Sequence, residues 1–211
     1  LKALPAKRQN VLCSATINDE VTTLAGQFMR HPVMVKAQED VPTVVTIQQR
    51  AIEVNRTNRG PLLRHLITTE KWDHALIFVA SVRAADILAA KLRTAGIVAD
   101  ALHGGMTQAQ RTTVLSEFKN KTVKILVATD IMARGIDIEK LPIVVNYDLP
   151  RSPSDYIHRI GRTARAGLSG VAISFIGHED KAHFVLIEKR AQTRLPRESI
   201  KGFEEVKPMV F

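Results

Sequence analysis

The feature of this sequence that most constrains its fold is a regular alternation of strand and helix patterns from residue 46 onward. Apolar runs such as Ile125-Leu126-Val127-Ala128 contain no alternating polar positions. This is typical of strands that are covered on both faces, as in a parallel sheet. Longer amphipathic segments separate the runs, as the helices of strand–helix–strand units would. The pattern therefore predicts an α/β sandwich with a mostly parallel sheet.

The predicted elements define one domain over residues 46–190. Strands are expected at residues 46–54, 75–79, 99–102, 124–128, 143–147 and 170–175. Helices are expected at residues 61–68, 82–95, 108–118, 153–161 and 179–190. Gly96 is placed as a left-handed cap after one helix, and Thr107-x-x-Gln110 has the spacing of a capping box before the next. The charged tail, residues 191–211, is too weakly patterned for its structure to be predicted.

Residues 1–38 carry a separate strand–helix–strand pattern. Strands are expected at residues 9–13 and 33–35, and a helix from Asn18 or Asp19 to Met29. Residues 39–45 are expected to be a linker. A unit of this size cannot bury both of its faces alone, so we expect it to be the end of a preceding domain and the chain to be a fragment. Its apolar side chains would then require disorder, docking on the following domain or exchange between chains.

Charge and cysteine content limit the classes of partner. Thirty Lys and Arg against 21 Asp and Glu give a net charge of +9, which favours a polyanion such as nucleic acid, although many basic proteins bind nothing acidic. No apolar run approaches the roughly 20 residues of a membrane span, so no membrane partner is expected. The single cysteine, Cys13, excludes an intramolecular disulfide and a Cys-rich zinc site. We expect a small buried thiol and a reducing, intracellular, cytoplasmic setting.

Small polar residues follow several of the predicted strands. In open α/β sheets, ligands bind at the carboxyl ends of the strands. Ser81, Gly104 and Thr129 each lie there and precede a predicted helix or turn. Hydroxyl groups and glycine backbone at one edge suit phosphate oxygens. The alternative is that Ser81 and Thr129 only cap helices.

Three arginines recur at three-residue spacing: Arg159, Arg162 and Arg165. While a helix lasts they share a face, where like charges repel by a few tenths of a kcal/mol per pair. The pattern favours an anion bound by the guanidinium groups, with a solvated basic face as the alternative. His158 lies beside them, and no second histidine has metal-ligand spacing, so no metal site is expected.

Two motifs of nucleotide hydrolysis are absent from the sequence. It contains no G-x-x-x-x-G-K-[ST] phosphate loop. It also contains no apolar strand that ends in paired acids for Mg²⁺. We therefore expect the chain alone to be unable to hydrolyse ATP.

Six motifs occur in the order and spacing of a DEAD-box RNA helicase, and the chain resembles that family from about residue 5 to residue 190. The motifs are SAT at residues 14–16, LIFVAS at 76–81, HG at 103–104 with QxxR at 108–111, TDIMARGID at 129–137, VNYDLP at 145–150 and YIHRIGRTARAG at 156–167. The resemblance implies a three-layer, RecA-like fold, namely the carboxyl-terminal helicase domain after the end of the first RecA-like domain. Departures are few: Ser81 stands where many members have Thr, and Ala164 where Gly is common.

The resemblance also implies roles for individual residues. Arg162 and Arg165 correspond to the catalytic arginine fingers that reach ATP, and Asp137 to the acid that contacts its ribose. The positions that hold the RNA backbone correspond to Ser81, Gly104, Arg111, Thr129, Arg134 and Gly135. Ser14, Thr16, His158 and Arg159 correspond to residues that couple the two domains.

The function implied by the resemblance is one half of an ATP-dependent RNA helicase. Its partners would be RNA, ATP with Mg²⁺, and an amino-terminal RecA-like domain on which it closes to unwind RNA duplexes locally. The Mg²⁺ ligands would lie in that other domain. Two alternatives stay open: a free-standing RNA-binding module without turnover, and an unrelated α/β enzyme for a phosphorylated metabolite.

Overall fold

The computed structural model describes residues 5, 7–14, 19–29, 31–35, 47–130, 141–163 and 170–204. The chain divides into two compact units, Leu1–Asp40 and Val41–Phe211. In the described ranges, no helix has both the length and the apolar character needed to cross a membrane.

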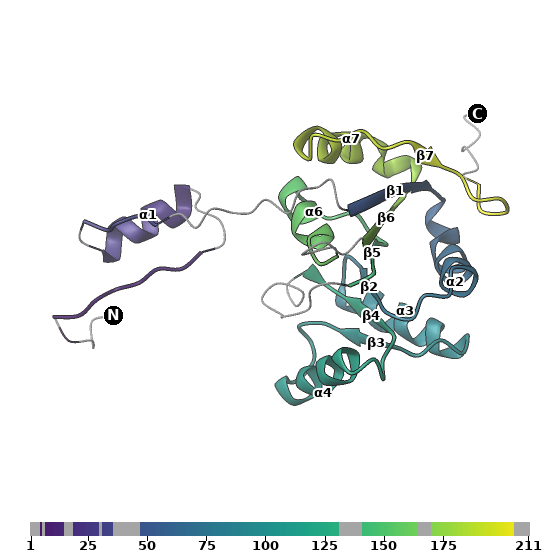
Figure 1. Cartoon of the computed structure of the whole chain (residues 1–211), viewed down its shortest axis with the longest axis horizontal. Coiled ribbons are helices and arrows are strands. Elements are labelled where there is room, and N and C mark those ends of the chain that lie inside the picture. The colour runs from purple at the N-terminus through teal and green to yellow at the C-terminus, as the bar shows by residue number, and fades with distance from the viewer. Residues whose placement is uncertain are drawn as a thin grey trace. The chain divides into compact units, whose positions relative to one another are not determined.

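The second unit contains a seven-stranded sheet (Figure 1). The strands are β1 (Ile47–Glu53), β2 (Ala75–Phe78), β3 (Ala99–Leu102), β4 (Ile125–Ala128), β5 (Ile143–Asn146), β6 (Gly170–Ile176) and β7 (Arg197–Glu198). Their order in the sheet is β3-β4-β2-β5-β6-β1-β7, and every pairing is parallel. The predicted α/β sandwich is confirmed, with a sheet that is more uniformly parallel than the sequence indicated.

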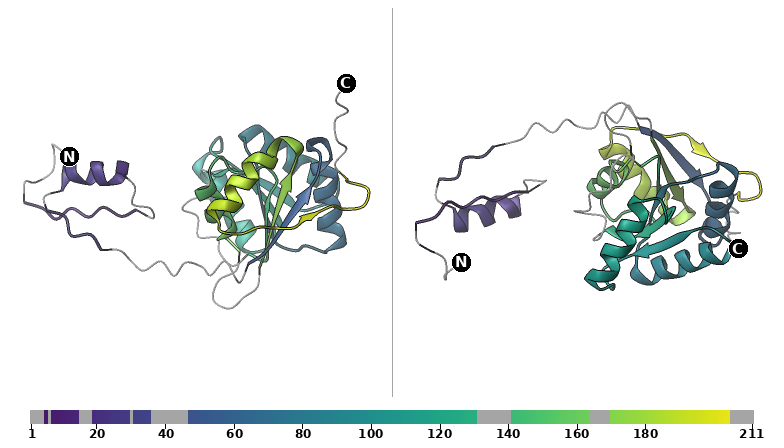
Figure 2. Two further views of the ribbon diagram at one scale, coloured as in Figure 1. Left: turned by 90° about the horizontal axis from the view of Figure 1, so that it is seen from above. Right: turned by 60° about the horizontal axis from the view of Figure 1, so that its bottom comes forward.

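Helices cover both faces of this sheet, so the unit has three layers (Figures 1 and 2). The helices are α2 (Arg59–Thr69), α3 (Val82–Thr94), α4 (Gln108–Lys119), α6 (Pro153–Ile160) and α7 (Lys181–Arg190). Alternate residues of a strand point to opposite faces. In β2, Ala75 and Ile77 therefore join the core under α2 and α3, whereas Leu76 and Phe78 join the core under α4.

Local signals in the sequence placed the element ends within two residues. Gly96 has φ of +78° after α3, as its predicted cap position requires. Thr107 and Gln110 form the predicted capping box at the start of α4. The Ser152 hydroxyl accepts a hydrogen bond from the Asp155 backbone N–H, with Pro153 in the first turn of α6.

The described part of the tail continues the domain beyond residue 190. Strand β7 pairs with β1, and Ile200 and Phe203 pack against the core under α2. Two arginines attach this segment: Arg50 bonds Glu198 through two nitrogens, and Arg197 bonds Glu188 through two nitrogens. The tail therefore extends the sheet by one strand that its weak sequence pattern did not indicate.

The first unit contains helix α1 (Asp19–Phe28), close to its predicted bounds. The two strands predicted beside it are wrong, since residues 9–13 and 33–35 form no strand. A strand needs a neighbour for its backbone hydrogen bonds, and the described part of this unit offers none. Val33 and Val35 are accordingly 88% and 83% exposed. Cys13 is also exposed, so the buried thiol expected there is wrong for the same reason.

Candidate functional site

The candidate site lies along the carboxyl ends of four neighbouring strands: β3, β4, β2 and β5. Backbone hydrogen bonds connect the segments that leave these strands. Thr129 N donates to Leu102 O (3.3 Å), Val79 N to Ala128 O (3.0 Å) and Asp148 N to Phe78 O (3.1 Å). The parallel sheet thus brings together the residues that follow the strands, including the predicted Ser81, Gly104 and Thr129.

Ser81 lies at the amino terminus of α3 and caps it. Its hydroxyl accepts a hydrogen bond from the Ala84 backbone N–H at 3.2 Å. The capping role that the sequence left open for Ser81 is therefore confirmed. The residue is also exposed, so the cap presents a polar group and the positive end of the helix dipole to solvent.

Gly104 and Arg111 border the same edge beyond β3. A Cβ atom at Gly104 would meet no atom of the described residues within 4 Å, so space is open above its backbone. The Nε of Arg111 donates to Met106 O at 3.1 Å, which holds its side chain along the start of α4. His103, just before Gly104, bonds Asp86 through Nε2 at 2.8 Å.

Arg159, in the last turn of α6, is buried and bound within its own domain. Its Nε and Nη2 donate to the two carboxylate oxygens of Asp130 at 2.6 and 2.8 Å. Its Nη1 donates to Asn146 Oδ1 at 3.1 Å and to Asp148 O at 2.6 Å. Arg159 therefore binds Asp130 as its anion. The spacing-based prediction of one external anion shared by three arginines is wrong for Arg159, because its side chain turns into the domain.

Arg162 lies beyond the end of α6, in a backbone that is anchored on both sides. Its N–H donates to Arg159 O at 3.1 Å, and its carbonyl accepts from Leu141 N at 3.1 Å. The hydroxyl of Thr163, the next residue, donates to Leu141 O. The side chain of Arg162 is half-buried. The anchored backbone therefore fixes the point from which this side chain extends.

Residues 59–167 match the family of the helicase conserved C-terminal domain, which is about half of the chain. The chain belongs to this family. Among curated proteins, the DEAD-box ATP-dependent RNA helicase CshA of Geobacillus kaustophilus is 39% identical over 197 residues, 93% of this chain and 42% of that protein. CshA of Bacillus subtilis is 36% identical over 98% of this chain and 43% of that protein.

Solved structures agree with the family assignment of this helicase domain. Dbp5 of S. cerevisiae bound to RNA and ADP BeF3 has a TM-score of 0.79 and 32% identity, over 94% of this chain and 53% of that chain. A DEAD box protein from Methanococcus jannaschii has a TM-score of 0.69 and 38% identity, over 89% of this chain and 50% of that chain. The RecA-like fold and the DEAD-box resemblance are thereby confirmed. The chain spans less than half the length of these curated relatives.

Several predicted residues lie outside the described residues of the chain. These are Thr16 in the first unit, and Arg134, Gly135, Asp137 and Arg165 in the second. His158 is exposed on α6, and Ser14 belongs to the first unit. Within the described ranges, no group of three His, Cys, Asp or Glu residues could hold a metal ion.

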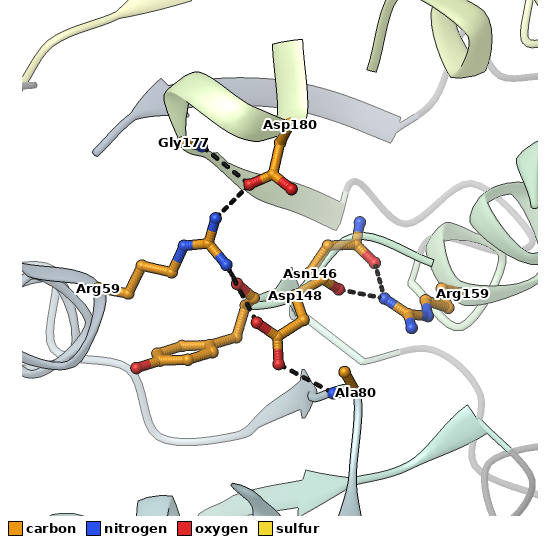
Figure 3. Close-up of polar contacts among 8 residues, drawn as sticks. Arg59, Ala80, Asn146, Asp148, Arg159, Gly177 and Asp180 are labelled. Atoms are coloured by element: carbon orange, nitrogen blue, oxygen red, sulfur yellow. Dashed lines mark hydrogen bonds and ion pairs between the residues drawn. The ribbon is translucent and has the colours of Figure 1, made fainter. Parts of the chain in front are cut away.

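Sequence reasoning missed Arg59 and its two carboxylate partners (Figure 3). Arg59 begins α2 and is 2% exposed. It donates to Asp148 Oδ1 at 3.0 Å and forms an ion pair with Asp180. The position of Asp148 after a buried strand was a signal that a cation should lie nearby. The sequence could not show which of its 30 Lys and Arg residues would supply it.

Proposed function

We propose that this chain is the carboxyl-terminal half of an ATP-dependent DEAD-box RNA helicase. The strand-end edge would hold the backbone of single-stranded RNA through Ser81, Gly104, Arg111, Thr129, Arg134 and Gly135. Arg162 and Arg165 would reach ATP bound by a separate amino-terminal RecA-like domain, and Asp137 would contact the ribose. The matches to DEAD-box helicases and the RNA in the Dbp5 structure support this proposal.

The observation that carries the proposal is the paired hydrogen bond between Arg159 and Asp130. Asp130 directly follows Thr129, on the edge proposed for RNA. Arg159 lies in the last turn of the helix that leads to Arg162, the residue proposed for ATP. One ion pair, whose arginine is buried, therefore joins the two proposed sites and gives a physical connection through which RNA binding would favour ATP turnover. Arg159 would thus contribute to coupling by holding both segments in register, and His158 and Ser14 would contribute at the surface.

The chemistry assigned to this chain is electrostatic. Phosphoryl transfer develops charge on the γ-phosphate, and an arginine placed there can contribute about 10³ to 10⁵ in rate. A guanidinium group is suited to this task because it stays charged and bonds phosphate oxygens in a fork. The sequence contains no phosphate loop, so ATP and its Mg²⁺ would be held by the amino-terminal domain. The same proposal places the protein in the cytoplasm.

RNA recognition would depend on the sugar-phosphate backbone. Hydroxyl groups, backbone N–H groups and a helix terminus bond phosphate without reading base sequence. The net charge of +9 would strengthen this binding at low salt. Closure of the two domains on one strand would favour a bent path of the RNA backbone that a duplex cannot follow, which would open the duplex locally.

RNA-stimulated ATP hydrolysis tests this proposal. It should be measured for the chain alone, for the amino-terminal domain of the same protein alone, and for both together. Turnover only in the mixture is the expected result. Turnover by the chain alone would show a complete active site and contradict the proposal. No turnover in the mixture, with RNA binding intact, would indicate an RNA-binding module.

A further inference from the structure

Arg59 is buried between three segments that are distant in the sequence (Figure 3). Its Nη1 donates to Asp148 Oδ1 at 3.0 Å and to Tyr147 O at 3.1 Å, just beyond β5. Its Nη2 bonds the Asp180 carboxylate, which also accepts from Gly177 N at 3.0 Å. Arg59 thus connects the start of α2 to the end of β5 and to the segment before α7.

The carboxylate of Asp148 continues this connection toward the candidate RNA edge. Its Oδ2 accepts a hydrogen bond from the Ala80 backbone N–H at 2.9 Å. Ala80 directly precedes Ser81, which caps α3. The two oxygens of one carboxylate are therefore divided between Arg59 and the Ser81 loop.

The backbone of Asp148 makes a second connection, to the other proposed RNA segment. Its carbonyl accepts from Arg159 Nη1 at 2.6 Å, and Arg159 holds Asp130. Asp130 adjoins Thr129. Asp148 is consequently the junction between the Ser81 loop and the Thr129 segment, and Arg59 is a buried cation on that junction.

The burial of Arg59 indicates a role beyond stabilising the fold. Helix α2 already buries Leu62, Leu63, Leu66 and Ile67. The Nε of Arg59 is buried and meets no hydrogen-bond partner among the described residues, which costs free energy. Apolar residues often replace a buried ion pair without loss of stability. The presence of an arginine here is better explained by the orientation that it imposes on Asp148.

We propose that Arg59 is a positioning residue for RNA binding, which acts through Asp148 to fix the Ser81 loop and the Thr129 segment. The side chains of Arg59 and Asp148 are 2% and 14% exposed, so water screens their interaction little. Without the guanidinium, the Asp148 carboxylate turns toward solvent and releases the Ala80 N–H. The loop at Ser81 then loses its fixed geometry for a phosphate. This inference rests on the proposed RNA-binding function.

The test compares Arg59→Lys with Arg50→Lys in the 211-residue chain. Both substitutions keep a positive charge and remove the guanidinium group, whose several nitrogens bond two carboxylates at once. Arg50 is matched because it also pairs with two acids, Glu70 and Glu198, whereas its pairs lie away from the strand-end edge. The RNA probe is a labelled single-stranded oligouridylate. A second readout is the amide proton resonance of Ala80 in the RNA-free chain, which reports the hydrogen bond to Asp148.

For Arg59→Lys we expect RNA binding to weaken roughly tenfold, as for the loss of one charge-assisted hydrogen bond. The Ala80 amide should shift in the direction of a weaker hydrogen bond. Arg50→Lys should leave both readouts unchanged. Wild-type RNA affinity with an unshifted Ala80 amide in Arg59→Lys would overturn the proposal.

Two further outcomes are informative. If Arg59→Lys fails to fold, Asp148→Asn provides the same test, because it keeps the shape of the side chain and removes the charge that holds Ala80. The proposal then predicts the same loss of RNA affinity and the same shift of the Ala80 amide, and wild-type values would refute it.

If the wild-type chain binds no RNA, the proposed function fails, and an unshifted Ala80 amide in the variants would also refute the positioning role of Arg59.

Discussion

Arg159 and Asp130, 29 positions apart in the sequence, form a two-pronged hydrogen bond at 2.6 and 2.8 Å. The guanidinium carbon of Arg159 also lies 4.8 Å from the centre of the Phe78 ring, at a distance that suits a cation–π contact. This one side chain thereby contacts Phe78 at the end of β2, Asp130 just after β4 and the Asp148 carbonyl just after β5. In the proposed enzyme, this side chain joins the RNA edge to the turn that carries Arg162.

Substitution of Arg159 should destabilise the domain. Arg159→Gln leaves Asp130 and the Asp148 carbonyl without their charged donor. Because Asp130 is 32% exposed, water can partly replace the donor, and the loss should cost about 2 kcal/mol. Urea denaturation measures this change in the free energy of unfolding. The exposed Arg151 provides a control, since Arg151→Gln should change stability by less than about 0.5 kcal/mol. Equal stabilities for the two variants would show that the ion pair does not hold the segments together.

Ser81 allows the capping role to be separated from the RNA role. Asn and Asp both cap helices about as well as Ser, so Ser81→Asn and Ser81→Asp should keep the stability of the domain to within about 0.5 kcal/mol. Only Ser81→Asp places a negative charge where a phosphate is proposed to bind. We expect Ser81→Asp to weaken RNA binding at low salt, and the difference from Ser81→Asn to shrink as salt is added. Thermal denaturation and a salt series of RNA binding are the measurements. Equal RNA affinities of Ser81→Asn and Ser81→Asp at low salt would show that no RNA phosphate binds close to Ser81.

The attachment of the tail should depend on pH through Glu188. The hydrogen bonds from Arg197 lower the pKa of Glu188 below its ordinary value of 4.5, and burial opposes this only in part. The folded state therefore favours the ionised carboxylate. Its contribution to stability is complete above pH 4.5 and is lost as pH falls through the lower, folded pKa. Glu188→Gln should be less stable than wild type at neutral pH, and this difference should narrow in acid.

Denaturation of both proteins from neutral pH to below the ordinary pKa of a glutamate checks this prediction. Arg93 provides a comparison, because its pair with Asp100 is largely exposed and should contribute little. A stability gap between Glu188→Gln and wild type that stays constant through the acid range would contradict the assignment of the pKa shift.

The fold was predictable because its signals are local. Strands such as β4 are buried along their whole length. Their uninterrupted apolar runs therefore indicated directly that both faces of the strand are covered. Gly96 and Thr107 marked helix ends by their chemistry. The strands expected around Val11 and Val33 failed because a strand depends on a partner, which no local pattern reports. Strand β7 was missed for the converse reason, since its two residues are held by Arg50 and by pairing with β1.

The candidate site was predictable only in part. The strand-end rule found Ser81, Gly104 and Thr129 because topology places such residues at one edge. Spacing suggested that Arg159 and Arg162 would share an anion, but spacing cannot show that a side chain turns inward to Asp130. Arg59 carried no local signal, since its partners Asp148 and Asp180 are 89 and 121 positions away. Pairings at such separations follow from the tertiary fold.

The role of Arg162 is tested most directly by RNA-stimulated ATP hydrolysis with both helicase domains present. Arg162→Ala should be compared with wild type and with Arg151→Ala, at saturating RNA and ATP. Loss of an arginine that stabilises the transition state predicts a fall in kcat of about 10³-fold or more, with Arg151→Ala equal to wild type. Wild-type turnover in Arg162→Ala would contradict the claim that this domain supplies an arginine to ATP.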